Sequence, residues 1–110
     1  MNDFKKSHRL VKKADIDFVF SNALKQDGRG FLLLFRHNQV NTPRLGIIIA
    51  KKHVPKAHDR NRLRRVVRET FRNIRCHIKN FDIIFLARSD LKNLDNRVLR
   101  NSLFNCFKLM

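Results

Sequence analysis

The segment spanning residues 51–75 constrains the fold most, because its apolar residues recur at the spacing of a single helix face. From residue 60 onward these residues are Leu63, Val66, Val67, Phe71 and Ile74. Their offsets of 0, 3, 4, 8 and 11 follow a rotation of about 100° per residue. The pattern therefore predicts a long amphipathic helix that begins between Pro55 and Asp59, because proline is tolerated in a first helical turn but disfavours helix in the residue before it.

The opposite face of this predicted helix is almost entirely basic. It carries Asn61, Arg64, Arg65, Arg68, Arg72 and Arg75, with Arg60 and Arg62 flanking its first turn. Like charges one turn apart cost about 0.2–0.5 kcal/mol per pair, and Glu69 offsets only part of that repulsion. A solvated surface normally mixes signs, so we favour an anionic partner over a plain solvated face. Arginine points to nucleic acid, because its planar fork pairs with phosphate oxygens and stacks on bases.

Length and charge agree with one basic domain. The chain has 110 residues and 25 Lys and Arg against 9 Asp and Glu, a formal charge of +16 that indicates a polyanionic partner. No apolar stretch approaches the roughly 18 residues of a membrane span, and the N-terminus lacks a secretory hydrophobic region, so we expect a cytoplasmic protein. Cys76 and Cys106 show no metal-binding spacing and are expected to be reduced and structural.

The hydrophobic pattern predicts three strands and two further helices around the basic helix, after a basic lead-in at residues 2–13. The predicted elements are a helix at about Asp15 to Leu24, strands at Phe31 to Arg36, Arg44 to Ala50 and Phe81 to Ala87, and a closing helix capped by Asp95. The strand at 44–50 is so apolar that we expect it at the centre of the sheet. Residues 26–30 are predicted as a turn and residues 37–43 as a hairpin connection. The order indicates an α+β fold with a β-α-β unit, normally right-handed.

The sequence contains no pattern typical of a protein active site, since its acidic residues are spread thinly and no nucleophile motif is present. We therefore predict an RNA-binding module. RNA is favoured over DNA because a sheet with basic and apolar residues is a common single-strand platform, whereas the commonest basic-helix DNA readers are all helical. Phe18 falls off the apolar stripe of the first helix, which leaves open whether it is a stacking surface or is buried against another element.

One motif resembles a known family. The run Arg60-Asn61-Arg62, followed by Leu63-Arg64-Arg65 and Arg68-Glu69, resembles the RNR signature of the bacterial ribonuclease P protein subunit. The resemblance covers nearly the whole chain. Its further parts are Arg9-Leu10, Asp17-Phe18-Val19-Phe20, Gly46, Ala50-Lys51-Lys52, Ala57, Asp82, Ala87-Arg88 and Leu94-Asp95-Asn96-Arg97.

The resemblance implies a two-layer α-β sandwich with a mixed sheet of about four strands and a left-handed crossover at the basic helix, in one RNA-binding domain over residues 1–110. It also implies a protein without catalytic residues that assembles, as a monomer in a 1:1 complex, with a large ribonuclease P RNA. That RNA hydrolyses one phosphodiester of precursor tRNA to free the mature 5′ end. The Mg²⁺ ions would be held mainly by the RNA and the substrate, and no DNA or membrane partner is expected.

The resemblance also implies two binding surfaces, whose residues are assigned here by their positions in the matching motifs. The expected RNA-binding residues, including Arg72 from the same basic face, are Lys51, Lys52, Arg60, Asn61, Arg62, Arg64, Arg65, Arg68 and Arg72. The expected cleft for the 5′ leader is formed by Ile16, Phe20, Leu34, Arg36 and Arg88, and ordinary core is the alternative for its three apolar members. Many family members carry aromatic residues at or near Ile16 and Leu34, so stacking here would rest on Phe20.

Two rival functions are compatible with the residues. A ribosomal or other RNA-structuring protein would use the basic face in assembly and would need no cleft for a single strand. A DNA-binding regulator would be a dimer with base-edge contacts. Competition between precursor tRNA and duplex DNA separates the last from the others.

Overall fold

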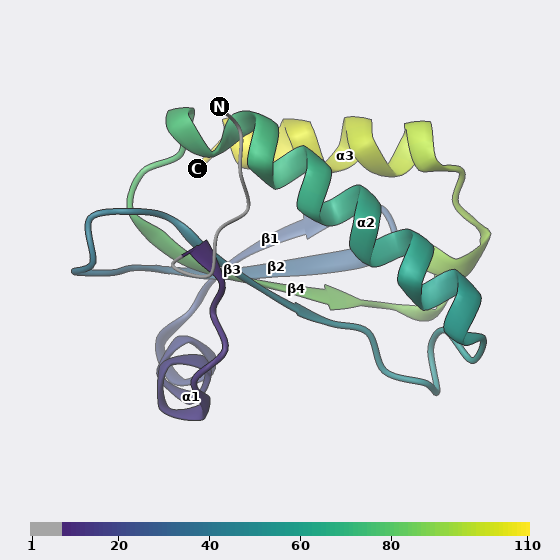
Figure 1. Ribbon diagram of the computed structural model, residues 1–110, viewed down its shortest axis with the longest axis horizontal. Helices are drawn as coiled ribbons and strands as arrows, with labels where there is room; N and C mark the ends of the chain where they lie inside the picture. The colour runs from purple at the N-terminus through teal and green to yellow at the C-terminus, as the bar shows by residue number, and fades with distance from the viewer. Residues whose placement is uncertain (1–7) are drawn as a thin grey trace.

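A four-stranded mixed sheet organises the molecule, with helices on both of its faces (Figure 1). The structure is a computed structural model that describes residues 8–110, apart from the side chains of Asp90 and Lys92. Residues 2–7 of the expected basic lead-in lie outside the described residues. The elements are α1 (Lys13–Asn22), β1 (Leu24–Gly28), β2 (Phe31–His37), β3 (Arg44–Ile48), α2 (Ala57–Ile74), β4 (Phe81–Ala87) and α3 (Asn96–Lys108), with short 3₁₀ turns η2 (Arg75–His77) and η3 (Ser89–Asn93).

The strand order is β1-β2-β4-β3, with β2 antiparallel to β1 and β4 and with β3 parallel to β4. The three predicted strands are present, but the turn predicted at residues 26–30 is wrong because β1 occupies residues 24–28. This strand has no apolar alternation, since Lys25, Gln26 and Asp27 follow one another. The turn itself is confined to the next two residues, where Gly30 has a φ of 77° that favours glycine.

Strand β3 lies at an edge of the sheet, so the central position expected for it is wrong. Its outer edge is partly covered by the N-terminal segment, because the Leu10 N–H donates to the Leu45 carbonyl at 2.9 Å. Gly46 permits this approach, since a Cβ there would lie 3.1 Å from the Leu10 carbonyl oxygen. Residues 37–43 do not form a hairpin either, because β4 lies between the strands that they connect.

The connection from β3 through α2 to β4 is a left-handed crossover. In Figure 1 both strands run to the right, α2 lies above the sheet, and β3 is nearer the viewer than β4. Seen from the helix side with the strands pointing up, β4 therefore lies to the left of β3. This is the uncommon hand for a parallel β-α-β unit, so the hand implied by the resemblance is confirmed and the right-handed default is wrong.

The main hydrophobic core lies between the sheet and the layer formed by α2 and α3 (Figure 1). The predicted apolar stripe of α2 is confirmed, because Leu63, Val66, Val67, Phe71 and Ile74 are all buried there. Full burial of such a side chain contributes about 1.5–3 kcal/mol. The Asp95 side chain caps α3 as predicted, accepting from the Arg97 N–H at 2.7 Å.

Helix α1 covers part of the other sheet face over a smaller core. Val19 is its buried residue and packs with Leu10, Leu34 and Ile84. Leu34 and Ile84 are register partners on β2 and β4, so α1 packs on the two central strands of the sheet. Among the described residues, no helix is both long and apolar enough to cross a membrane.

A largely buried ion pair closes one end of this face. The Arg44 guanidinium donates to Asp82 from Nε (2.8 Å) and Nη2 (2.7 Å), and the Asn38 side chain donates to the same carboxylate at 2.9 Å. Asp15 of α1 lies 3.5 Å from Arg44 Nη1. The hydrogen bonds to Asp82 raise the pKa of Arg44 above its ordinary value, against the opposing effect of burial. The pair therefore joins β3, β4, α1 and the residue 37–43 loop.

Candidate nucleic-acid interface

The outer side of α2 forms a basic surface that is open to solvent. Asn61, Arg64, Arg65, Arg68 and Arg72, called the α2 face below, line one shallow hollow together with Glu69. They share this side because they recur at three- and four-residue spacing opposite the buried stripe. Arg64 and Arg68 also border a second hollow, whose other wall includes Leu10 and Val11. The predicted basic face is therefore present as one continuous surface.

The two arginines of the RNR run are held by the protein itself. Each donates from Nη1 to acceptors outside α2. The acceptors are the Val54 (3.0 Å) and Pro55 (2.8 Å) carbonyls for Arg60, and the Leu94 carbonyl (3.4 Å) and Asn96 Oδ1 for Arg62. Arg60 thereby fixes the start of α2 to the preceding loop, and Arg62 fixes α2 to the start of α3. The sequence does not reveal these contacts, because the segments that supply the acceptors are distant or irregular.

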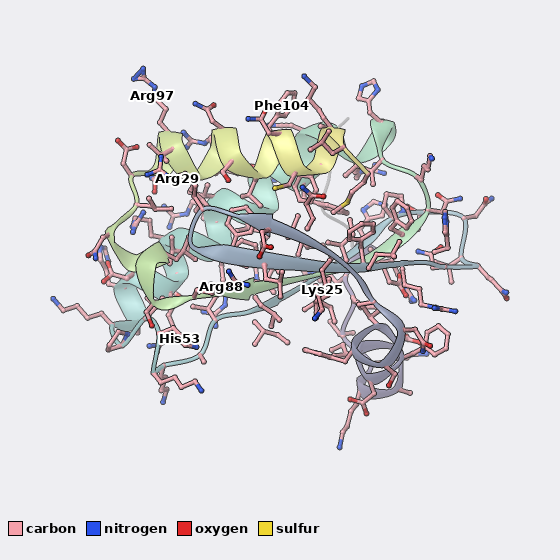
Figure 2. The ribbon with its side chains drawn as sticks, turned by 180° about the vertical axis from the view of Figure 1, so that it is seen from behind. Lys25, Arg29, His53, Arg88, Arg97 and Phe104 are labelled. Carbon is pink, nitrogen blue, oxygen red and sulfur yellow. The ribbon has the colours of Figure 1, made fainter. Side chains whose placement is uncertain are left out.

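Lys51 and Lys52 are exposed in the turn that follows β3. The turn is tied to the segment after β4, because His53 Nδ1 and Ser89 Oγ are 2.8 Å apart. Since β3 and β4 are parallel, this turn and Arg88 emerge at the same end of the sheet. Figure 2 shows His53 and Arg88 on the side of the sheet that carries α1.

The apolar residues expected in the leader cleft differ in their availability. Leu34 is buried in the small core under α1, and Ile16 is half-buried against that core. Phe20 is 47% exposed. Leu34 is therefore an ordinary core residue and Ile16 is partly one, as the alternative interpretation expected. The Phe20 ring, in contrast, is open to a partner.

Arg36 lies on the opposite flank of α1 from Phe20. Its guanidinium carbon is 4.5 Å from the centroid of the Phe18 ring, and Nη1 donates to the Asn22 carbonyl at 3.4 Å. Side chains two residues apart on a helix differ in direction by about 200° around its axis. Phe18 and Phe20 therefore project from different flanks of α1. Phe18 is 52% exposed and carries a cation over one face, which excludes deep burial for it.

Arg36 and Arg88 do not meet. Arg36 pairs in register with Asp82, so six residues of extended chain separate it from the level of Arg88. At about 3.3 Å per residue this is roughly 20 Å. Of the expected cleft residues, the structure brings Ile16, Phe20 and Leu34 together around α1, with the two arginines at opposite ends.

Strand β1 adds charged residues that the sequence pattern missed. Asp27 Oδ1 lies 3.1 Å from Arg88 Nη2, and both side chains are largely exposed. Lys25 is the register partner of Leu34, so it shares the α1 side of the sheet (Figure 2). In the sequence, only the alternation of the charged residues Lys25 and Asp27 with Gln26 indicated a strand with one charged face. Over the described part of the chain, no group of three His, Cys, Asp or Glu side chains is placed to hold a metal ion.

Comparison with known proteins gives one consistent result. A family model described as Ribonuclease P matches residues 4–110. The ribonuclease P protein component of Pseudoalteromonas atlantica is 46% identical over 98 residues, covering 89% of this chain and 82% of that protein. That of Legionella pneumophila (strain Lens) is 47% identical over 93 residues, covering 84% and 80%.

Solved structures of related proteins agree with the family match. The RNase P protein of Staphylococcus aureus superposes with a TM-score of 0.87 at 31% identity, covering 94% of this chain and 95% of that one. The RNase P protein of Thermotoga maritima superposes with a TM-score of 0.82 at 34% identity, covering 93% and 96%. The similarity therefore extends over at least 80% of the length of every chain compared.

Proposed function

Because this chain belongs to the ribonuclease P protein family, we propose that its α2 face binds the RNA subunit and that the sheet face under α1 holds the 5′ leader of precursor tRNA. It serves tRNA processing as the protein component of ribonuclease P. The two surfaces lie on opposite sides of the sheet (Figure 1). One protein monomer would then bridge the RNA subunit and its substrate in a 1:1 complex.

The observation that carries the proposal is the α2 face. Four guanidinium groups stand there at helical spacing, and among the described residues Glu69 is the one carboxylate that lines the same hollow. Phosphate is the matching partner, because the guanidinium fork binds two oxygens at once. Lys51 and Lys52 would extend the contact at the turn after β3. Arg60 and Arg62 would contribute indirectly, because their hydrogen bonds hold α2 against the preceding loop and the start of α3.

The leader would follow the α1 side of the sheet. The exposed Phe20 ring offers a stacking surface, and base–aromatic stacking is worth about 1–3 kcal/mol per base. Ile16 and Leu34 supply the apolar floor beside it, since neither presents an aromatic ring. Arg88 would bind leader phosphates at one end of this face and Arg36 at the other.

We assign the hydrolysis to the RNA and no catalytic group to this chain. The described residues bring together no group of three His, Cys, Asp or Glu side chains that could hold a metal ion. We place the Mg²⁺ ions on the RNA subunit and the substrate. We also propose a cytoplasmic location, which accords with the free thiols of Cys76 and Cys106.

The test is cleavage of precursor tRNA by a bacterial ribonuclease P RNA at low Mg²⁺, with and without the protein. Restored cleavage at the mature 5′ end supports the proposal. Tight RNA binding without any gain in cleavage would favour a general RNA-structuring protein. Equal competition by duplex DNA and precursor tRNA would instead favour a DNA-binding regulator.

A further inference from the structure

The outer side of α3 presents an aromatic ring within a row of cations. Its exposed residues are Arg97, Arg100, Asn101, Phe104, Asn105 and Lys108. Phe104 is 45% exposed, although Leu103 and Phe107 beside it are fully buried in the core. The Lys108 Nζ atom lies 5.4 Å from the centroid of the Phe104 ring. Figure 2 shows Arg97 and Phe104 projecting from α3 away from the sheet.

The charge of this row has one sign. Residues 96–108 contain no Asp or Glu, so three cations and no anion belong to the helix itself. Two carboxylates border the helix: Asp95 caps its start by accepting from the Arg97 N–H, and Oε2 of Glu69 on α2 lies 4.0 Å from Arg100 Nη2. Because Glu69 also lines the hollow of the α2 face, the α3 row continues that basic surface onto the neighbouring helix.

We propose that this α3 row is a second RNA-binding surface, on which an unpaired base of the RNA subunit stacks on Phe104. Lys108 and Arg100 stand one helical turn on either side of the ring, where they would bind the phosphates that flank the stacked base. Arg97 lies a further turn away and would bind the next phosphate. An aromatic ring between cations suits single-stranded nucleic acid, because every base has a π-face and every nucleotide carries a charge. The inference rests on the proposed function, since it takes the same RNA as its ligand.

Two other occupants fit less well. The leader would run on the α1 side of the sheet, whereas Phe104 lies on the opposite side from Lys25 and Arg88 (Figure 2). A second copy of the chain would need about 800 Å² of buried surface per partner. A phenylalanine side chain buries about 150–250 Å² in full, and less than half of this one is available. Like charges on the two copies would also repel.

A single tryptophan makes the contact visible, because the chain contains neither Trp nor Tyr. In Phe104→Trp the indole replaces the ring and is the only tryptophan fluorophore. Adding the RNA subunit should quench and shift its emission, while an isolated leader oligonucleotide should not. Val40→Trp is the matched control, since Val40 is 47% exposed in the loop on the α1 side. A Phe104→Trp spectrum that changes with protein concentration alone would overturn the inference in favour of self-association.

Affinity for the RNA subunit gives the second readout. Phe104→Ala should weaken binding about 5- to 150-fold, the range that corresponds to one stacked base, and Phe104→Trp should restore it. The slope of log affinity against log salt should not change in Phe104→Ala, whereas Lys108→Gln should reduce it by about 0.7–0.9. A merely structural effect of Phe104→Ala would appear as a lower melting temperature, which is measured on the same samples.

Arg65→Ala separates this inference from the function on which it rests. If Arg65→Ala weakens RNA binding and Phe104→Ala does not, the proposal that the α3 row binds RNA is wrong, while the proposal for the α2 face is supported. If neither change weakens binding, both proposals are wrong. If both weaken it and only Arg65→Ala lowers the salt slope, the α3 row is supported as a stacking surface.

Discussion

Replacing Asp82 with alanine should cost about 3 kcal/mol of folding free energy. The change removes the acceptor of three hydrogen bonds, two from Arg44 and one from Asn38. Breaking a buried pair by removing one partner costs about 3–5 kcal/mol, because it leaves an uncompensated charge. The lower end applies here, since the Arg44 side chain is 18% exposed and keeps Asp15 at 3.5 Å.

An exposed ion pair on the same sheet supplies the control. Asp27 and Arg88 are 3.1 Å apart, but their side chains are 75% and 51% exposed. Exposed pairs are worth about 0–1 kcal/mol, since water and salt screen them. Asp27→Ala should therefore lose less than about 1 kcal/mol, although its pair looks equivalent by distance.

Chemical and thermal unfolding followed by far-ultraviolet circular dichroism measures both variants. With an unfolding entropy of about 2.1 cal/mol/K per residue, 1 kcal/mol corresponds to roughly 4 °C in a chain of this length. Asp82→Ala should then melt about 12 °C below the parent, and Asp27→Ala within about 4 °C of it. The Arg44→Ala, Asp82→Ala double variant should be less destabilised than the sum of the two single variants, because no buried charge remains unpaired.

Equal losses in Asp82→Ala and Asp27→Ala would refute the reasoning, since burial would then not decide the strength of the pair. Additive losses in the double variant would refute it in another way. That outcome would mean that Arg44 and Asp82 act independently and that the hydrogen-bond geometry carries no coupling.

Four further outcomes are expected. Arg65→Ala should lower the slope of log RNA affinity against log salt by about 0.7–0.9 without changing the melting temperature. Arg62→Ala should instead lower the free energy of unfolding by about 1–2 kcal/mol, because its hydrogen bonds to the start of α3 are lost. Phe20→Ala should weaken binding of precursor tRNA by about 1–3 kcal/mol and leave binding of mature tRNA unchanged, as measured by filter binding. Burial raises the pKa of Cys106, so its thiol stabilises the fold at lower pH. This contribution is lost as the pH rises through the alkaline range where only the unfolded thiol ionises. Cys106→Ala should flatten that alkaline loss, and iodoacetamide should modify the exposed Cys76 first.

The elements with strong periodicity could be predicted from the sequence. The apolar stripe of α2 predicts its buried side and, by exclusion, the basic side, because a helix of this length has one solution for such a pattern. The strands β2 and β4 follow from apolar runs bounded by turn residues. Each of these predictions depends on local sequence alone, and each is confirmed.

The predictions that failed depend on partners distant in sequence. An apolar run suggested that β3 was central, but Leu10 and α2 cover an edge strand equally well. Strand β1 was missed because its register with β2 is set by pairing and not by its own polar side chains. The inward contacts of Arg60 and Arg62 were missed for the same reason, since their acceptors lie outside α2, in loops and at the start of α3.

The position of β4 sets the order in which the chain can assemble. Strand β3 has β4 as its neighbour in the sheet, and β2 has only β1 beside it until β4 forms, although β4 is made after more than two thirds of the chain. Between the end of β3 at residue 48 and the end of β4 at residue 87, synthesis at 5–20 residues per second takes about 2–8 s. During that interval two apolar strands have no central neighbour, which is the condition under which nascent chains pair with one another. The charge of +16 counteracts this hazard, because like-charged chains repel before the sheet closes. The cationic character of the protein would thus protect its own synthesis before it serves any partner.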